Sequence, residues 1–146
     1  MNQTLTRDEL KALTRGQIVD VDLGPKIGAK KENQVFVGTE LGGQRRCVIV
    51  QADAFNENWS TLIVVPILGL EGKAPGGEDR AVRVTEVLIP KGTAGQTKNG
   101  AAQANQIRTI DRYKRVVRIL GTVPPEVMAE IEKKIRLVLG MVDLTP

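Results

Sequence analysis

Histidine is absent from this chain of 146 residues. Its absence excludes every Ser-His or Cys-His catalytic arrangement, a histidine general base and any metal site with histidine ligands. The single cysteine, Cys47, excludes an internal disulfide and a thiolate zinc cluster, and in its apolar segment we expect a small core residue. One thiol without a bridge is typical of a reducing compartment, so we expect a cytoplasmic protein.

Long apolar runs are also missing. The longest, Leu62 to Leu68, contains Pro66, and it is far shorter than the roughly 18 residues of a membrane-spanning helix. The start of the chain, Met1 to Leu10, is polar and lacks the apolar stretch of a signal peptide. We therefore expect neither a membrane span nor a membrane partner.

The residues that are present indicate one globular domain over 1–146. Hydrophobic residues make up 41% of the chain and charged residues 26%, with 15 glycines. The net charge is +4 and the pI about 9.4, which favours a polyanion or an acidic protein as partner. Aromatic residues are only 3% of the chain, which limits the stacking of bases.

Period-two patterns predict several short strands. From Gly16 to Leu23, Val19 and Val21 face inward while Asp20 and Asp22 alternate with them, as in a half-buried strand. The two carboxylates are expected to face water, with a shared magnesium ion as the alternative. The β-branched run Thr61 to Ile67 indicates the centre of the sheet. Further strands are expected over 46–51, 81–89, 101–106 and 116–120, a small one over 35–37, and turns or helical turns over 53–58 and 111–114.

Two helices complete the pattern. Thr6 and Glu9 form a capping box that starts a short helix over 7–13 in an N-terminal extension, residues 1–14. Pro124 and Pro125 open an amphipathic helix that Gly140 ends. The fold class is mainly β (α+β): a small, barrel-like antiparallel sheet with a C-terminal amphipathic helix and a short N-terminal helix, the barrel and terminal helix covering 15–140.

The order of short motifs is more specific than any one of them. The chain reads Arg-Gly-Gln-Ile-Val from Arg15, Asp-Leu-Gly-Pro from Asp22 and Gly-Gln-Arg from Gly43. Val-Val-Pro-Ile then starts at Val64 and Gln-Ile-Arg-Thr-Ile-Asp at Gln106. From about Arg15 to about Gly140 this order resembles the MazF/PemK (Kid) family, toxins of bacterial type II toxin-antitoxin systems that share a fold with CcdB.

The resemblance implies a homodimer of SH3-like barrels that cuts single-stranded RNA at a short sequence without the ribosome, a metal or a cofactor. An acidic antitoxin is the implied second partner. In this reaction the ribose 2′-hydroxyl attacks the phosphate, which leaves a 2′,3′-cyclic phosphate and a 5′-hydroxyl. The protein must accept a proton, stabilise the crowded phosphate oxygens and protonate the leaving oxygen.

Arg45 matches the family's arginine after the glycines and is the implied catalytic residue. Its guanidinium presents a rigid fork of donors to two phosphate oxygens, so charge stabilisation is the expected role. A surface arginine at a strand entrance is the alternative. Arg46, on the opposite face, stands where family members commonly have proline and is a weaker, substrate-binding candidate.

Three positions depart from the family pattern. Leu68 replaces a threonine that contacts the reacting phosphate, and Gln103 and Asn105 replace an arginine and an aspartate that one branch carries. An amide is no general acid or base. Either another residue, such as Thr85 or Glu86, does that work, or the chain is slow or inactive as a nuclease.

Substrate binding is assigned to six residues. Asn105 and Gln106 offer the paired donors and acceptors that read unstacked bases, although Gln106 and Arg108 are equally suited to pinning the sheet and dimer. The cationic stretch that includes Arg108 and Arg118 is either a solvated face or, with basic residues of the first loop, a phosphate groove. The six residues are Lys30, Lys31, Arg46, Asn105, Gln106 and Arg108.

Two alternatives to a nuclease stay open. One is a relative that only binds RNA or antitoxin, and the other is a gyrase poison like CcdB, whose terminal helix carries a tryptophan that residues 126–139 lack. The segments 30–41 and 69–79 exceed the compact pattern and are expected to border the groove. Trp59, in a turn, is expected at the antitoxin or dimer interface or in the core.

Overall fold

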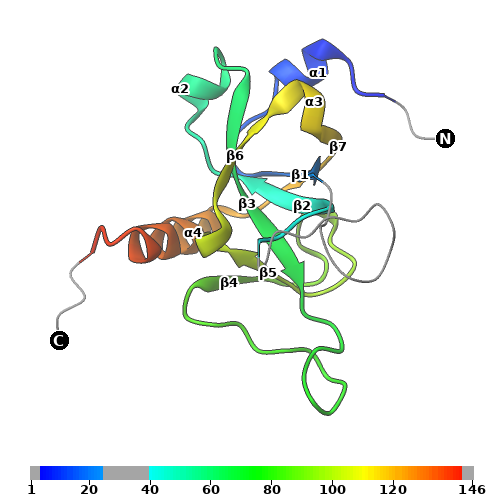
Figure 1. Cartoon of the computed structure of the whole chain (residues 1–146), viewed down its shortest axis with the longest axis vertical. Coiled ribbons are helices and arrows are strands. Elements are labelled where there is room, and N and C mark those ends of the chain that lie inside the picture. The colour runs from blue at the N-terminus through cyan, green and yellow to red at the C-terminus, as the bar shows by residue number, and fades with distance from the viewer. Residues whose placement is uncertain (1–3, 25–39, 143–146) are drawn as a thin grey trace.

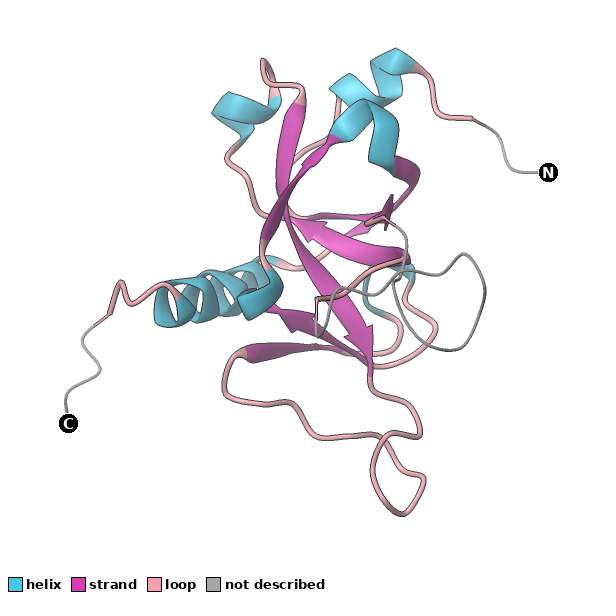
Figure 2. Cartoon of the chain, viewed as in Figure 1, coloured by secondary structure: helices cyan, strands magenta, loops and turns pink. Residues whose placement is uncertain are grey.

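The chain folds into one antiparallel sheet with helices packed on it (Figures 1 and 2). The computed structural model describes residues 4–24 and 40–142. Six strands follow the order β4-β5-β3-β2-β1-β7, and β6 pairs with β3. The strands are β1 (Gln17–Asp22), β2 (Gln44–Ile49), β3 (Thr61–Gly69), β4 (Glu86–Ile89), β5 (Gly100–Gln103), β6 (Arg108–Asp111) and β7 (Val116–Thr122).

Helices cap the ends and one face of the sheet. The predicted capping box is present, since Thr6 and Glu9 each accept a hydrogen bond from the other's backbone N–H. The terminal helix ends at Gly140 as expected, because a φ of +70° there is readily adopted only by glycine. The helices are α1 (Arg7–Lys11), α2 (Asp53–Asn56), α3 (Arg112–Arg115) and α4 (Pro125–Val138), with 3-10 turns η1 (Thr93–Gly95) and η2 (Ala104–Gln106). No helix in the described ranges is long and apolar enough to span a membrane.

Two apolar clusters lie on the two faces of the sheet. One joins Val19, Cys47 and Val64 to Leu10 and Leu13 of the N-terminal segment. Leu10 of α1 and Leu13 just after it are buried, so the N-terminal segment packs against the core of the domain. The other cluster seats α4 on the sheet through residues that include Ile18, Val48, Val65, Met128 and Ile131.

Strand β1 is buried on both faces, which corrects the prediction of a half-buried strand. Asp20 is only 6% exposed instead of facing water. Arg46 of β2 and Arg118 of β7 lie on either side of it, with guanidinium nitrogens 3.9 and 2.9 Å from its oxygens, so the buried carboxylate has cationic partners. Alternation in sequence revealed the strand but not its charged partners.

The chain along one edge of β3 is interrupted by η2. The predicted strand over 101–106 ends at Gln103, and β6, which the sequence did not reveal, resumes pairing at Arg108. The predicted strand over 81–89 begins only at Glu86. The expected small strand over 35–37 lies outside the described residues. The 3-10 turn η2 therefore places Asn105 and Gln106 outside the hydrogen-bonded strand ladder.

The sheet is barrel-like but not closed. Its end strands, β4 and β7, do not pair within the described ranges, and the β4–β5 connection bridges them by laying η1 against β7. At this contact a Cβ on Gly121 would lie 2.8 Å from the Cα of Ala94. The connection between β4 and β5 is therefore packed at its centre, and glycine at 121 permits the close approach.

Candidate functional site

Arg45 lies at the entrance to β2, opposite Val21 of β1. Its Nε donates to the carbonyl of Gly42 at 3.2 Å. Within the described ranges its two Nη groups make no hydrogen bond, which leaves the forked end of the guanidinium for a ligand. Burial lowers the pKa of Arg45 from its ordinary value, but a guanidinium is still a cation at neutral pH.

Arg45 and Leu68 lie just beyond the end of the β2–β3 ladder, whose last pair is Cys47 and Pro66. Arg45 is two residues before Cys47 and Leu68 is two residues after Pro66, so by strand alternation each is on the same face of its strand as its paired neighbour. Continuing the β3–β5 register by one residue sets Gln103 opposite Pro66. We call this surface, made by Arg45, Cys47, Pro66, Leu68 and Gln103, the Arg45 face.

Cys47 on the Arg45 face is a core residue, as predicted. It is fully buried, and burial raises the pKa of its thiol to about 12. The thiol is therefore protonated at neutral pH and has no nucleophilic role.

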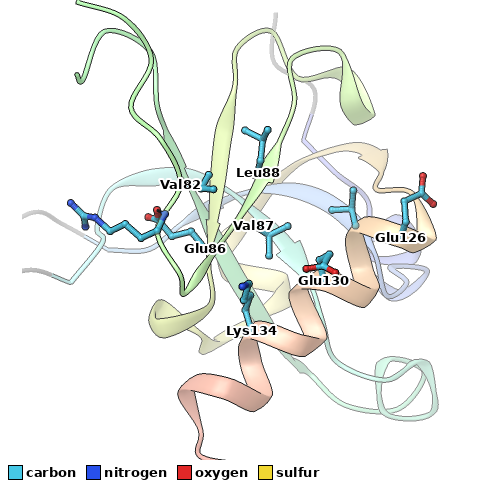
Figure 3. Close-up of a pocket in the computed structure, with 9 residues that line it drawn as sticks. Val82, Glu86, Val87, Leu88, Glu126, Glu130 and Lys134 are labelled. Carbon is cyan, nitrogen blue, oxygen red and sulfur yellow. Dashed lines mark hydrogen bonds between the residues drawn. The ribbon is translucent and has the colours of Figure 1, made fainter. Parts of the chain in front are cut away.

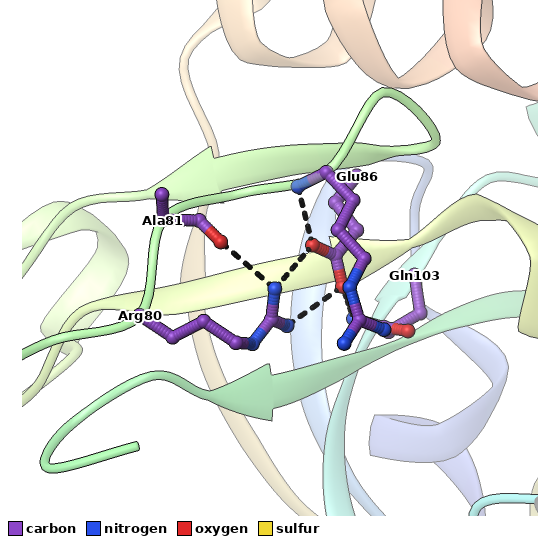
Figure 4. Close-up of polar contacts among 5 residues, drawn as sticks. Arg80, Ala81, Glu86 and Gln103 are labelled. Carbon is purple, nitrogen blue, oxygen red and sulfur yellow. Dashed lines mark hydrogen bonds and ion pairs between the residues drawn. The ribbon is translucent and has the colours of Figure 1, made fainter. Parts of the chain in front are cut away.

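Glu86 joins the Arg45 face through Gln103, its partner across β4 and β5 (Figure 4). The Arg80 guanidinium donates from both Nη atoms to the two carboxylate oxygens, at 3.0 and 2.9 Å. The backbone N–H of Arg83 donates at 2.6 Å, and the side-chain amide of Gln103 donates from the other side. The Glu86 side chain is 1% exposed.

These contacts exclude Glu86 as the general base that the sequence suggested. Burial raises its pKa, but hydrogen bonds from Arg80, Arg83 and Gln103 outweigh burial and hold the pKa below its usual value. Each carboxylate oxygen already accepts two hydrogen bonds. Glu86 instead holds the long β3–β4 connection against the sheet.

Gln106 and Arg108 hold the ends of the first long loop. The amide oxygen of Gln106 accepts from the backbone N–H of Leu41 at 3.4 Å. Arg108 donates to the carbonyls of Leu41 and Leu23, at 3.3 and 3.4 Å. Both side chains therefore contact backbone groups of the same chain on either side of this loop, whereas Asn105 in η2 is exposed. Lys30 and Lys31 lie outside the described residues.

Arg46 lies on the opposite face from Arg45, as its neighbouring position on the strand predicts. Its register partner is Asp20, whose carboxylate also accepts a 2.9 Å hydrogen bond from Arg118. The guanidinium of Arg46 is thus part of a charged row across the sheet. Because the Asp20 carboxylate is paired with guanidinium groups, it is not available to share a magnesium ion with Asp22, which was the alternative from the sequence.

The basic residues after Arg108 do not line one groove. Arg112 is 1% exposed and donates to the carbonyls at the end of α1, at 3.3 and 3.4 Å. Arg115 donates to the carbonyl of Asp22 at 2.9 Å, while Lys114 is exposed. Four-residue α3 turns these side chains in different directions, which a charge count along the sequence does not show.

A groove of about 450 Å³ lies between β4 and α4 (Figure 3). Val82, Val87 and Leu88 line one side, and Glu126, Glu130 and Lys134 lie along the helix. The charged lining residues are Glu86, Glu126 and Glu130 with Arg83 and Lys134, and this small excess of carboxylates disfavours RNA there. The phosphate site is better sought on the Arg45 face.

A family model for the PemK-like, MazF-like toxin of type II toxin-antitoxin systems matches residues 14–139. The chain belongs to this family. The match spans α4 and every strand of the sheet, which agrees with the predicted extent of 15–140.

Solved structures of toxins of this family share the fold. MazF from Deinococcus radiodurans is 24% identical, with a TM-score of 0.64, covering 88% of this chain and 97% of that one. An endoribonuclease from a Mycobacterial species, solved with its cognate antitoxin, is 21% identical with a TM-score of 0.63, covering 90% and 99%. The Mycobacterium tuberculosis toxin MazF-mt6 is 16% identical with a TM-score of 0.55, covering 69% and 91%.

Arg80 of this PemK-like chain is a structural residue that no signal in the sequence indicates. It directly follows the glycine-rich segment 69–79, which is expected from the sequence to border the groove. The structure joins the base of that connection to Leu70 through the backbone N–H of Arg80, at 3.0 Å. Its side chain then meets Glu86 from outside the sheet. No sequence motif could indicate this pairing, because Arg80 reaches Glu86 only through the folded path of the β3–β4 connection.

Proposed function

We propose that this chain cleaves single-stranded RNA as the toxin of a toxin-antitoxin pair, without a metal. Attack by the ribose 2′-hydroxyl breaks the bond to the 5′-oxygen and leaves a 2′,3′-cyclic phosphate and a 5′-hydroxyl. Membership in the PemK-like toxin family supports the proposal. The observation that carries it is the Arg45 guanidinium, anchored through Nε with its forked end unengaged within the described ranges.

Arg45 acts by stabilising charge. During attack the nonbridging phosphate oxygens gain negative charge, and a guanidinium with two parallel donors fits two such oxygens. The anchor on Gly42 fixes the fork before substrate arrives, so little side-chain entropy is lost on binding. Asn105, exposed in η2, is the base-reading residue. Lys30, Lys31, Gln106 and Arg108 are the other proposed RNA contacts.

Leu68 weakens the chemistry without removing the binding surface. It is two residues beyond Pro66, the last residue of β3 that pairs with β2, and it has no donor for a phosphate oxygen. A missing transition-state donor costs on the order of 10²-fold in rate. We therefore propose a slow nuclease, with a relative that binds RNA without cutting it as the second candidate.

One experiment separates these candidates. Purified protein is incubated in EDTA with a long, varied single-stranded RNA, and the cut positions and end groups are mapped. Cuts at one short motif that end in cyclic phosphate support the nuclease. RNA that stays intact while being retarded on a gel supports the binding protein, and RNA that is neither cut nor bound rejects both candidates.

The proposed partners follow from the same surface. An acidic antitoxin competes with RNA for the Arg45 face, because both bring negative charge to one guanidinium. We further propose a homodimer in the cytoplasm. Sedimentation of the free toxin at several concentrations tests the dimer, and displacement of labelled RNA by antitoxin tests the shared site.

A further inference from the structure

Helix α2, in the connection from β2 to β3, is held by a buried amide network. The side-chain amide of Gln51 donates to Asn56 at 2.8 Å, and that of Asn56 donates to Asp53 at 3.0 Å. Asp53 also accepts from the backbone N–H of Arg15 at 2.8 Å. Gln51 and Asn56 are almost fully buried. Gln51 Oε1 is buried without a partner in the described part of the chain, but the other side-chain amide atoms of Gln51 and Asn56 are hydrogen-bonded. These bonds rigidify a segment that has little packing of its own.

The rigid segment displays two aromatic side chains. The Phe55 and Trp59 rings stack with centroids 4.4 Å apart and an interplanar angle of 29°. Phe55 is 46% exposed and Trp59 49%, so the core alternative for Trp59 is wrong. An exposed aromatic pair on a preorganised support is typical of a binding surface, because aromatic anchors contribute much of the energy of protein interfaces.

The charges around the pair are negative. Residues 52–60 include Asp53 and Glu57 but no lysine or arginine. Glu57 is exposed and lies two residues from each ring. The cation beside this segment, Arg15, is already bound to Glu132 at 2.7 Å and to the carbonyl of Val50 at 3.2 Å. Carboxylates repel phosphate, whereas the faces of aromatic rings attract cations.

We propose that Phe55, Glu57 and Trp59 form a docking site for a protein segment that presents a lysine or arginine beside an apolar side chain. The apolar group covers the ring pair, and the cation lies against a ring face near Glu57. This chemistry is the opposite of that on the Arg45 face, which suits an anion. The toxin therefore has two binding surfaces of opposite preference.

Trp59 is the only tryptophan, so its indole N–H gives one NMR resonance that reports on this site. The probe is a blocked peptide, Gly-Arg-Leu-Lys-Gly, and the matched probe is Gly-Glu-Leu-Glu-Gly. We expect a saturable indole shift with the basic peptide and an affinity at least about tenfold lower for the acidic one. Equal affinities, preference for the acidic peptide or no saturable shift would overturn the proposal.

Variants distinguish the site from a general charge effect. Phe55→Ala and Glu57→Lys are each expected to lower the affinity for the basic peptide by about tenfold or more. Glu78→Lys, the same charge change in the exposed β3–β4 connection, is expected to leave the affinity unchanged. An equal loss in Glu78→Lys would show that net charge alone is responsible and would overturn the site.

Two other occupants are tested directly. A short uridine oligonucleotide that shifts the indole more strongly than the peptide would assign the pair to RNA instead. An indole shift that depends on protein concentration, matched by dimer formation in sedimentation and insensitive to the peptide, would assign it to a second copy. Either result overturns the docking site proposed here.

Discussion

Arg45 and Arg46 are neighbours in sequence with different surroundings. Arg45 is anchored to a backbone carbonyl with its fork unengaged within the described ranges, while Arg46 lies beside the buried Asp20. Strand alternation predicted that they face opposite sides. It could not predict that Asp20 is buried, because burial depends on Arg118 of β7, which is 98 residues away.

Leu68→Thr is expected to raise the RNA cleavage rate. Threonine adds a hydroxyl donor on the Arg45 face, and a donor to the reacting phosphate is worth about 10²-fold in favourable geometry. Initial rates on one labelled RNA, with RNA affinity measured alongside, check this. Leu68→Val serves as the β-branched control without a hydroxyl. A rate that rises equally in both variants, or in neither, would mean that position 68 does not meet the phosphate.

Among the elements, the β3–β4 connection depends most on one side chain. Glu86 is held by Arg80, Arg83 and Gln103, and its pKa in the folded protein is lowered from 4.5. A lowered pKa means that the stabilisation is present above the unfolded value and is lost as the pH falls through the folded value. The connection should therefore loosen in acid.

Glu86→Gln tests this clamp. At neutral pH the variant should be less stable than the wild type, because the buried Arg80 ion pair is lost. The difference in the free energy of unfolding should shrink as the pH is lowered from neutrality to well below 4.5, the ordinary pKa of a glutamate, because the wild-type carboxylate is then protonated. Urea titrations across this range measure it. Glu71→Gln, at an exposed pair with Lys98, is the control, and a pH-independent difference for Glu86→Gln would contradict the clamp.

Gly121→Ala is expected to destabilise the protein by about 1–3 kcal/mol. The added methyl would meet the backbone of Ala94 in η1, which is less able to move than a side chain. Thermal or urea unfolding checks the change. Gly69→Ala, where an added Cβ would have no atom within 4 Å, should be neutral or slightly stabilising. Equal effects of the two substitutions would mean that the η1 contact with β7 is not close.

Local signals in the sequence predicted most of the elements. The capping box, the two prolines that open α4 and the β-branched run of β3 act within a few residues, so they are legible without a structure. The break between β5 and β6 was missed because η2 contacts α4 and β3 rather than its own neighbours. Tertiary packing therefore sets the position of this break.

At the scale of the molecule, family and fold follow from the sequence, but the distribution of charge does not. In the sequence, the cationic stretch that includes Arg108 and Arg118 is compatible with either a solvated face or one phosphate groove. The structure instead separates an Arg45 face from an acidic segment around Phe55 and Trp59, and it buries Arg112. Contacts between segments that are distant in sequence decide which charged side chains are exposed. Short-range sequence patterns do not reveal those contacts.

The most direct test of the proposed nuclease compares Arg45→Ala with Arg46→Ala in EDTA on one long single-stranded RNA. The two variants remove the same side chain from adjacent positions, and urea unfolding confirms that each remains folded. We expect Arg45→Ala to lose cleavage by about 10²-fold or more, with Arg46→Ala close to wild type and the wild-type ends in cyclic phosphate. Equal rates in wild type and Arg45→Ala would contradict the assignment of this guanidinium to the reaction.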